Sequence, residues 1–174
     1  SVAGTPTMLA TNVIYAPFGP VSSLLYGNGL TRSQIYDQDY RLTGITTSAG
    51  TTNIQNLSLV SDRVNDIVSI VDNLIGPNSQ NFVYDSYYRL TQAVGYYGAE
   101  KYTYDGDGNR LTRTVGNVTE TYHYATTANV LQSTLKSGIA RSLTYTANGN
   151  ISSDNRGTTT SLSFGYGNRN RFIA

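Results

Sequence analysis

A short motif that begins with tyrosine recurs about every 21 residues along the chain. Its three clearest copies read YDQDYRLT, YDSYYRLT and YDGDGNRLT, and they begin at Tyr36, Tyr84 and Tyr104. Weaker copies place the equivalent first residue, here called the anchor, at positions 15, 61, 124, 145 and 166. We therefore predict that residues 1–174 form a single block of about eight repeats, each contributing the same structural unit.

Each repeat has the alternation expected of a β-hairpin. Turn-forming residues follow the anchor, including Asp107-Gly108 and Asn148-Gly149, and a second alternating run comes after them. Two strands in each repeat predict about sixteen short strands and an all-β fold, a curled antiparallel sheet. The residue two positions before the anchor is apolar in every repeat except at Gln34, which indicates one buried face per strand. These apolar residues are Val13, Leu59, Phe82, Tyr102, Tyr122, Leu143 and Phe164.

One segment, residues 65–75, is compatible with either a helix or a strand. Its apolar residues roughly follow one helical face, but β-branched residues dominate it and its place in the repeat corresponds to a strand. We favour the strand. The longer anchor spacings around this segment predict additional loop at residues 46–56 and 76–80.

The composition excludes several classes of protein. The chain has no cysteine, which removes disulfides and thiolate chemistry, and its one histidine, His123, leaves little room for a histidine-based site. A net charge of +1 argues against a nucleic-acid partner. No run of about 18 apolar residues and no signal peptide is visible, so no membrane-spanning segment is predicted. Because residue 1 is not methionine, we expect a segment of a larger protein.

The repeat resembles the YD repeat of Rhs proteins, which also occurs in the BC components of Tc toxins and in teneurins. The best match is Tyr102–Thr114 (YTYDGDGNRLTRT), and the resemblance covers roughly residues 12–174. Four copies lack the aspartate after the anchor, and the copy at Ser61 lacks the tyrosine. The residues assigned to the structural motif are Tyr36, Asp37, Arg41, Leu42, Tyr84, Asp85, Arg89, Leu90, Tyr102, Tyr104, Asp105, Gly108, Asn109, Arg110, Leu111, Tyr122, Tyr124, Tyr145, Gly149, Tyr166 and Arg171.

This resemblance implies a non-catalytic scaffold. In Rhs proteins and Tc toxins the repeats form a spiral β-shell around a toxic C-terminal domain, and in teneurins they support adhesion at the cell surface. By that resemblance we expect a segment of such a shell, in a polymorphic toxin that a bacterium secretes or displays on its surface. Its partners would be the other repeats of the parent polypeptide and an enclosed toxin or effector domain. A cell-surface adhesion or carbohydrate-binding module is the alternative, with glycans as the partner.

The motif residues have simple physical roles in such an array. Stacked tyrosines would pack on the next repeat, and an aspartate or a turn amide would serve the buried hydroxyl. The recurring arginines (Arg41, Arg89, Arg110 and Arg171) would pair with Asp37, Asp85 and Asp105 of the same or the adjacent repeat. Exposed tyrosine rings would instead favour sugar binding. Unpaired strand edges at the two ends predict self-association of the isolated block.

Candidate chemistry is sparse. Residues 105–109 resemble the start of an EF-hand loop, but Arg110 and Gly116 stand where the glycine and the bidentate glutamate belong. A turn is therefore the preferred interpretation, and His123 is expected on the more polar face of its strand. The sequence predicts no catalytic residue, no metal site and no cofactor. The protease of a self-processing relative would lie outside this segment.

Overall fold

The computed structural model describes residues 8–157, 160–167, 169 and 171–173. Asn168 and Asn170 of the last predicted repeat lie outside these residues. The described residues form fifteen strands, with a short 3₁₀-helix, η1 (Gly76–Asn78), between β6 and β7. The strands are β1 (Ala10–Tyr15), β2 (Val21–Tyr26), β3 (Leu30–Tyr36), β4 (Leu42–Ala49), β5 (Thr52–Ser61), β6 (Ile67–Asp72), β7 (Gln80–Tyr84), β8 (Leu90–Gly95), β9 (Gly98–Tyr104), β10 (Arg110–Val115), β11 (Val118–Tyr124), β12 (Leu131–Lys136), β13 (Ile139–Tyr145), β14 (Ile151–Arg156) and β15 (Thr160–Ser163).

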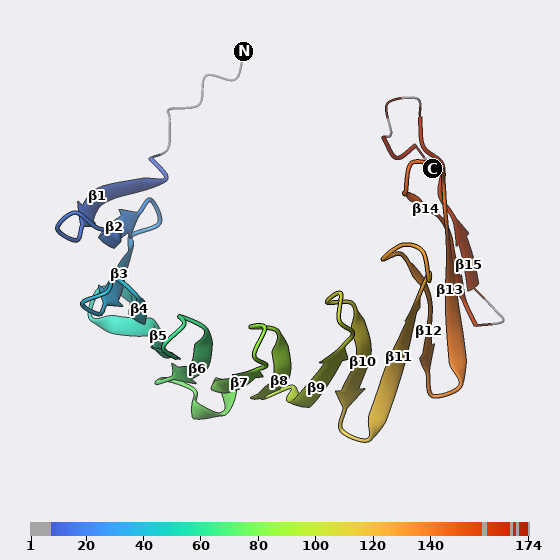
Figure 1. Ribbon diagram of the computed structural model, residues 1–174. Coiled ribbons are helices and arrows are strands. Elements are labelled where there is room, and N and C mark those ends of the chain that lie inside the picture. Colours follow the sequence, from blue (N-terminus) through green and yellow to red (C-terminus); the bar gives the residue numbers. More distant parts are fainter. Residues whose placement is uncertain (1–7, 158–159, 168, 170, 174) are drawn as a thin grey trace, which may run out of the picture. The chain divides into compact units, whose positions relative to one another are not determined.

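The strands follow one another in sequence order in an antiparallel meander (Figure 1). The all-β prediction is therefore confirmed. The chain divides into two compact units, Ser1–Tyr97 and Gly98–Ala174, here called unit 1 and unit 2. Unit 1 contains β1 to β8, and unit 2 contains β9 to β15.

The predicted hairpin register agrees with the observed strands. Each anchor from Tyr15 to Tyr145 is the last residue of an odd-numbered strand, and the next even-numbered strand pairs back onto it. After β15, an isolated bridge joins Tyr166 to Phe172 at the position of the eighth hairpin. Residues 67–72 form β6, so the strand interpretation of the ambiguous segment is confirmed.

The extra residues between the early anchors are used in two ways. The predicted loop at residues 46–56 is wrong, because those residues lengthen β4 and β5, which meet through a turn at Gly50 and Thr51. The predicted loop at residues 76–80 is partly right, since η1 occupies most of it. An insertion in a paired hairpin can extend the ladder and keep its backbone hydrogen bonds, which a loop would have to find elsewhere.

A single layer of sheet leaves little room for a core. The buried apolar side chains of the described residues are Leu59, Ala93, Tyr122 and Leu143, which are 5–8% exposed. Three of these lie two residues before an anchor, as the alternation predicts. Val13 occupies the same place in β1 but is 42% exposed, because β1 has a paired strand on one side only.

The hairpins use two kinds of turn. Within a repeat, most connections have five residues and a single positive φ near their end, as at Gly108 (φ 88°) and Gly149 (φ 80°). Asp107 and Asn148, the residues before these glycines, are not in the left-handed region, so the predicted Asp-Gly and Asn-Gly pairs do not form two-residue I′ turns. Between repeats the connection is often two residues, as at Ser137 and Gly138, where both φ values are positive.

Candidate functional site

The aspartate after the anchor closes the five-residue turn. In the repeat anchored at Tyr36, Oδ1 of Asp37 accepts the backbone N–H groups of Asp39 and Arg41, both at 2.9 Å. Asp85 and Asp105 accept the equivalent pairs of N–H groups at 2.8–3.0 Å. The hydrogen bond from the backbone N–H of Arg41 is the main cause that lowers the pKa of Asp37, and the hydrogen bond from the Arg41 guanidinium lowers it further. This residue type recurs because a carboxylate can accept two turn amides at once.

The motif arginine pairs with that aspartate in two repeats. Nε of Arg41 lies 2.6 Å from Oδ2 of Asp37, and Nε of Arg89 lies 2.8 Å from Oδ2 of Asp85. Both pairs form within one repeat. Nη1 of Arg41 also donates to the backbone carbonyl of Asp62 at 3.3 Å, which links one turn to the turn of the following hairpin.

The expected pair between Arg110 and Asp105 does not form. Oδ2 of Asp105 accepts the side-chain amide of Asn109 at 2.9 Å, and the Arg110 guanidinium lies 4.4 Å from the ring centroid of Tyr122. The reason is that the turn of this repeat has the usual five residues, so Asn109 takes the arginine position. The YDGDGNRLT copy is one residue longer than the other two, and the extra residue shifts Arg110 to the first position of β10 and Leu111 into a bulge, where it is 39% exposed.

In the repeats anchored at Tyr36 and Tyr84, the motif leucine and threonine have the same two structural roles. Leu42 and Leu90 are the half-buried first residues of β4 and β8. The following Thr43 and Thr91 sit at the bulge and donate their hydroxyls to the carbonyls of Ile35 and Val83 at 3.2 and 3.1 Å. A bulge leaves a carbonyl without its ladder partner, and the threonine hydroxyl replaces it.

The anchor tyrosines join neighbouring hairpins. The hydroxyls of Tyr36, Tyr84 and Tyr145 donate to the backbone carbonyls of Val21, Ile67 and Leu131 at 2.9, 2.9 and 2.6 Å. Each acceptor is the first residue of the second strand in the preceding hairpin. The prediction that an aspartate or a turn amide would serve these hydroxyls is therefore wrong for these three repeats. A carbonyl at a fixed backbone position is available to every repeat whatever its side chains are.

The remaining motif tyrosines and Arg171 occupy equivalent positions. Tyr104 and Tyr124 end β9 and β11 as half-buried residues. The Tyr166 ring lies 6.0 Å from that of Phe172, edge to face. Arg171 is exposed, and its backbone carbonyl accepts the N–H of Gly167 at 2.9 Å, as the carbonyl of Arg41 accepts that of Asp37 in the earlier repeat.

The repeat anchored at Ser61 keeps the turn without the tyrosine or the arginine. Oδ1 of Asp62 accepts the N–H groups of Val64 and Asp66, both at 2.9 Å. Asp66 occupies the arginine position, and its Oδ2 is buried without a hydrogen-bond partner in the described part of the chain. The turn therefore depends on the aspartate alone.

Unit 2 carries a network of charged and aromatic side chains that the repeat motif does not predict. The Arg113 guanidinium donates to both carboxylate oxygens of Glu100 at 2.9 and 2.7 Å, and the Tyr102 hydroxyl donates to the same carboxylate. These hydrogen bonds, first from Arg113 and then from Tyr102, lower the pKa of Glu100 to about 2. The Tyr122 hydroxyl donates to Glu120 at 2.8 Å. The sequence does contain a signal for these contacts. Both glutamates lie four residues before an anchor, so their side chains lie on the same face of the strand as the anchor tyrosine.

A second cluster of the network surrounds Asp154, which is 2% exposed. Arg141 donates to both of its oxygens at 2.7 and 2.9 Å, and Arg156 donates to Oδ2 at 2.8 Å. These two arginines lower the pKa of Asp154 to about 2. Register explains the cluster, since Asp154 lies directly opposite Leu143 and Arg156 lies opposite Arg141.

The geometry offers little for catalysis. In the EF-hand-like segment, the carboxylate of Asp105 is engaged by the turn amides and by Asn109. Within the described residues, no group of three or more histidines, cysteines or acidic residues is arranged to hold a metal ion. His123 is exposed, next to the buried Tyr122 in β11. None of the described helical segments has the length and apolar character needed to cross a membrane.

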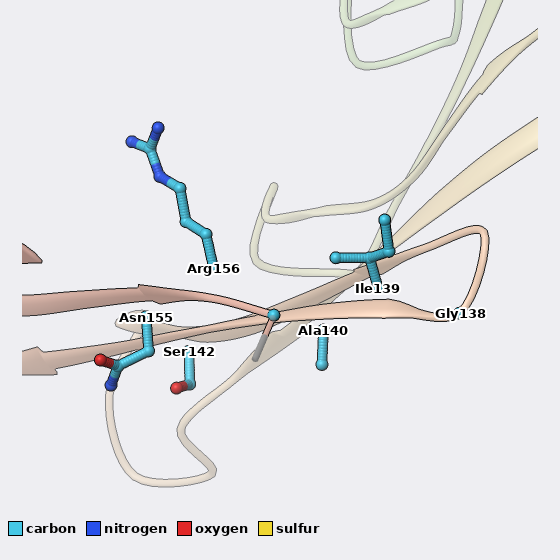
Figure 2. Close-up of a pocket in the computed structure, with 7 residues that line it drawn as sticks. Gly138, Ile139, Ala140, Ser142, Asn155 and Arg156 are labelled. Carbon is cyan, nitrogen blue, oxygen red and sulfur yellow. The ribbon is translucent and has the colours of Figure 1, made fainter. Parts of the chain in front are cut away.

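A hollow of about 630 Å³ lies beside β13 and β14 in unit 2. Figure 2 shows that Ser142 and Asn155 point to one side of the strands, whereas Ile139 and Arg156 point to the other. Side chains on opposite sides of a sheet cannot converge on one ligand. We therefore assign no active site to this hollow.

Comparison with solved structures places this fold among Tc toxins. The chain matches the Photorhabdus luminescens Tc holotoxin pore over 98% of its length, with a TM-score of 0.69 and 17% sequence identity. It matches the TcdB2-TccC3-Cdc42 structure over 99% of its length, with a TM-score of 0.68 and the same identity. In both cases it covers 11% of the other chain. No family model and no curated protein matches it. The predicted resemblance is confirmed in the fold, which is that of a Tc toxin shell segment.

Proposed function

We propose that this chain is a non-catalytic wall segment of a YD-repeat β-shell that encloses a toxin or effector domain. The observation that carries the proposal is the structural match over 98–99% of this chain to only 11% of Tc toxin chains. Such a match is what a short segment of a much longer repeat wall would give. The block would contribute about eight hairpins to that wall.

The contacts between hairpins support a structural role. Each tyrosine hydroxyl bond from Tyr36, Tyr84 and Tyr145 crosses from one hairpin to the previous one, and the Arg41 guanidinium reaches the next turn. A lone hairpin is marginal in water, so stability must accumulate through such neighbour contacts. Motif residues in several repeats make these contacts, which supports a structural role for the motif.

The partners follow from the same proposal. They are the remaining repeats of the parent polypeptide, which would cover the open edges of β1 and β15, and the enclosed toxin or effector domain. The parent protein would be secreted or displayed by a bacterium. A nucleic-acid partner does not fit the net charge of +1.

The alternative, a carbohydrate-binding stripe formed by the anchor tyrosines, is less favoured. The anchors Tyr36, Tyr84, Tyr104, Tyr124 and Tyr145 are half-buried, and three of their hydroxyls are bonded to the backbone. Rings held between hairpins present little free face to a sugar. This arrangement supports the scaffold.

The test compares the 174-residue chain with the full parent polypeptide by sedimentation and limited proteolysis. We expect the short chain to associate through its open strand edges. The parent should be a compact monomer that protects a C-terminal piece from protease. A monomeric short chain together with a parent that protects nothing would contradict the proposal.

A further inference from the structure

The hairpin formed by β5 and β6 is the one repeat whose anchor is not a tyrosine. Ser61 ends β5 at that position and is half-buried. A serine side chain is much smaller than a phenol ring and cannot reach the preceding hairpin, as the hydroxyls of Tyr36, Tyr84 and Tyr145 do. The contact between this hairpin and the preceding one, β3–β4, therefore lacks a ring that three other repeats have.

The repeat anchored at Tyr84 shows where such a ring lies. The Tyr84 hydroxyl donates to the carbonyl of Ile67, the first residue of the second strand in the preceding hairpin. Burial, followed by the nearby charges of Asp66 and Asp62, raises the pKa of Tyr84. Both carboxylates belong to the turn of the preceding hairpin. An anchor ring thus lies beside the preceding turn, close to the first and last residues of that turn.

A hollow of about 150 Å³ lies at the equivalent place beside Ser61. Its lining residues are Asp37, Arg41, Thr43, Leu59, Val60 and Ser61. Asp37 and Arg41 are the first and last residues of the preceding turn, closed by the same hydrogen bond that joins Asp62 and Asp66 in the next one. The hollow therefore matches the place of an anchor ring. A cavity of roughly 150 Å³ is large enough to bind benzene.

The walls of the hollow suit an aromatic ring. Leu59 is 8% exposed and supplies an apolar side. The Arg41 guanidinium is fixed, because its Nε lies 2.6 Å from Oδ2 of Asp37 and its Nη1 donates to the carbonyl of Asp62 at 3.3 Å. A fixed guanidinium offers a plane on which a ring can stack without a further loss of side-chain entropy.

The chain already makes both contacts that a phenol would need. The Arg110 guanidinium lies 4.4 Å from the ring centroid of Tyr122, which is a guanidinium–phenol contact. The carbonyl of Ile67 accepts the Tyr84 hydroxyl at 2.9 Å. Leu42 is the counterpart of Ile67 beside the hollow, since it is the first residue of β4. Its carbonyl is therefore the acceptor for a hydroxyl bound there.

We propose that the hollow beside Ser61 binds a phenol ring, supplied by a tyrosine side chain of another polypeptide or by a free small phenol. The chain itself indicates the ligand, because other repeats hold a tyrosine at this place. The ring contacts Leu59 and stacks on Arg41, and its hydroxyl donates to the carbonyl of Leu42. An anion does not fit, since Asp37 already neutralises the guanidinium. This proposal goes beyond the wall function and does not depend on it.

The test is titration of the full 174-residue chain with p-cresol, the side-chain analogue of tyrosine. Ligand-observed NMR measures it, because self-association of the chain does not disturb that readout. We expect saturable binding with a Kd of about 1 mM. The variant Ser61→Tyr fills the hollow from within the chain and should weaken binding by about tenfold or more. The matched control, Ser86→Tyr, adds the same ring at an exposed turn position and should bind within about twofold of the unchanged chain.

Two further ligands separate the chemistry from the source. Toluene has the ring and methyl group of p-cresol without the hydroxyl, and it should bind the unchanged chain about fivefold less tightly. A pentapeptide of four glycines and a central tyrosine carries the phenol on a backbone. Peptide binding as tight as that of p-cresol identifies a tyrosine side chain as the source, whereas binding of p-cresol alone identifies a free phenol.

Three outcomes overturn the proposal. They are the absence of saturable p-cresol binding, equal binding of toluene, and equal binding of p-cresol to a Ser61→Tyr variant that circular dichroism shows to be folded. The toluene comparison uses the unchanged chain and so does not depend on how any variant folds. Sedimentation reports on the wall function separately, so failure of one proposal is distinguishable from failure of the other.

Discussion

Unit 1 and unit 2 have the same hairpins but hold their charges in different places. In unit 1 the arginine–aspartate pairs close turns, as with Arg41 and Asp37, and they are partly exposed. In unit 2 they cross the face of the sheet, as with Arg141 and Asp154, where the carboxylate is 3% exposed. The repeat therefore determines the backbone, whereas the arginine–aspartate pairs that stabilise it can lie either in the turns or on the face of the sheet. The face pairs should contribute more to stability, because water screens them less.

The largest expected effect is that of Asp154→Ala. Removing this carboxylate leaves Arg141 and Arg156 without their shared partner, and we expect the free energy of unfolding to fall by about 2 kcal/mol. Urea denaturation followed by circular dichroism measures it. The control is Asp39→Ala in unit 1, since Asp39 is 77% exposed and 3.5 Å from Arg41, and it should change nothing measurable. Equal effects from the two variants would remove the distinction between turn and face.

Acid should weaken the face pairs of unit 2. The pKa of Glu100 is lowered from 4.5 to about 2, chiefly by Arg113, and that of Asp154 is lowered from 3.8 to about 2, chiefly by Arg141. A lowered pKa in the folded state means that the stabilisation is complete above about pH 5 and is lost as the pH falls toward 2.

Urea midpoints measured between pH 6 and pH 2.5 test this loss. Glu100→Gln should reduce the fall in the urea midpoint between pH 6 and pH 2.5, because the amide does not titrate. Turn aspartates such as Asp37 and Asp105 also have lowered pKa values, so part of the drop should persist in that variant. An unchanged drop would show that Glu100 does not contribute.

The tyrosine hydroxyl bond between hairpins should be equivalent in the two units. Tyr84→Phe in unit 1 and Tyr145→Phe in unit 2 each remove one bond to a backbone carbonyl, and each should cost about 1 kcal/mol. Tyr15 is 63% exposed and makes no hydrogen bond through its hydroxyl to the described residues, so Tyr15→Phe is the control. Thermal denaturation of the three variants checks this, and unequal losses at Tyr84 and Tyr145 would contradict the equivalence.

The smallest effect is expected at the residues with positive φ in the five-residue turns. Tyr88→Gly should raise the free energy of unfolding by about 0.5 kcal/mol, because relief of the positive φ outweighs the added freedom of glycine in the unfolded chain. The reverse change in unit 2, Gly149→Tyr, should lower it. Urea midpoints of the pair measure both, and a destabilised Tyr88→Gly variant would mean that the ring contributes packing that its exposure does not reveal.

The repeat made much of the fold predictable. The anchor spacing located the ends of the odd strands, and it favoured a strand over a helix in the ambiguous segment, where residues 67–72 form β6. The prediction from the repeat failed where residues that align in the motif were assumed to be structurally equivalent. Arg110 matches Arg41 in the motif, yet a turn of constant length makes Asn109 its structural counterpart. Backbone hydrogen bonding sets the turn length, and side-chain identity follows it.

The sequence alone determined the all-β hairpin architecture and the pairing of Arg41 and Arg89 with the motif aspartates. These depend on residues within one repeat, whose spacing is visible in the chain. Only the tertiary structure determined the partner of each tyrosine hydroxyl, the formation of the Glu100 and Asp154 clusters and the exposure of the aromatic residues in the five-residue turns of unit 1. Those features depend on strand register and on bulges that shift it by one residue, and a shift of one residue moves every following side chain to the other face.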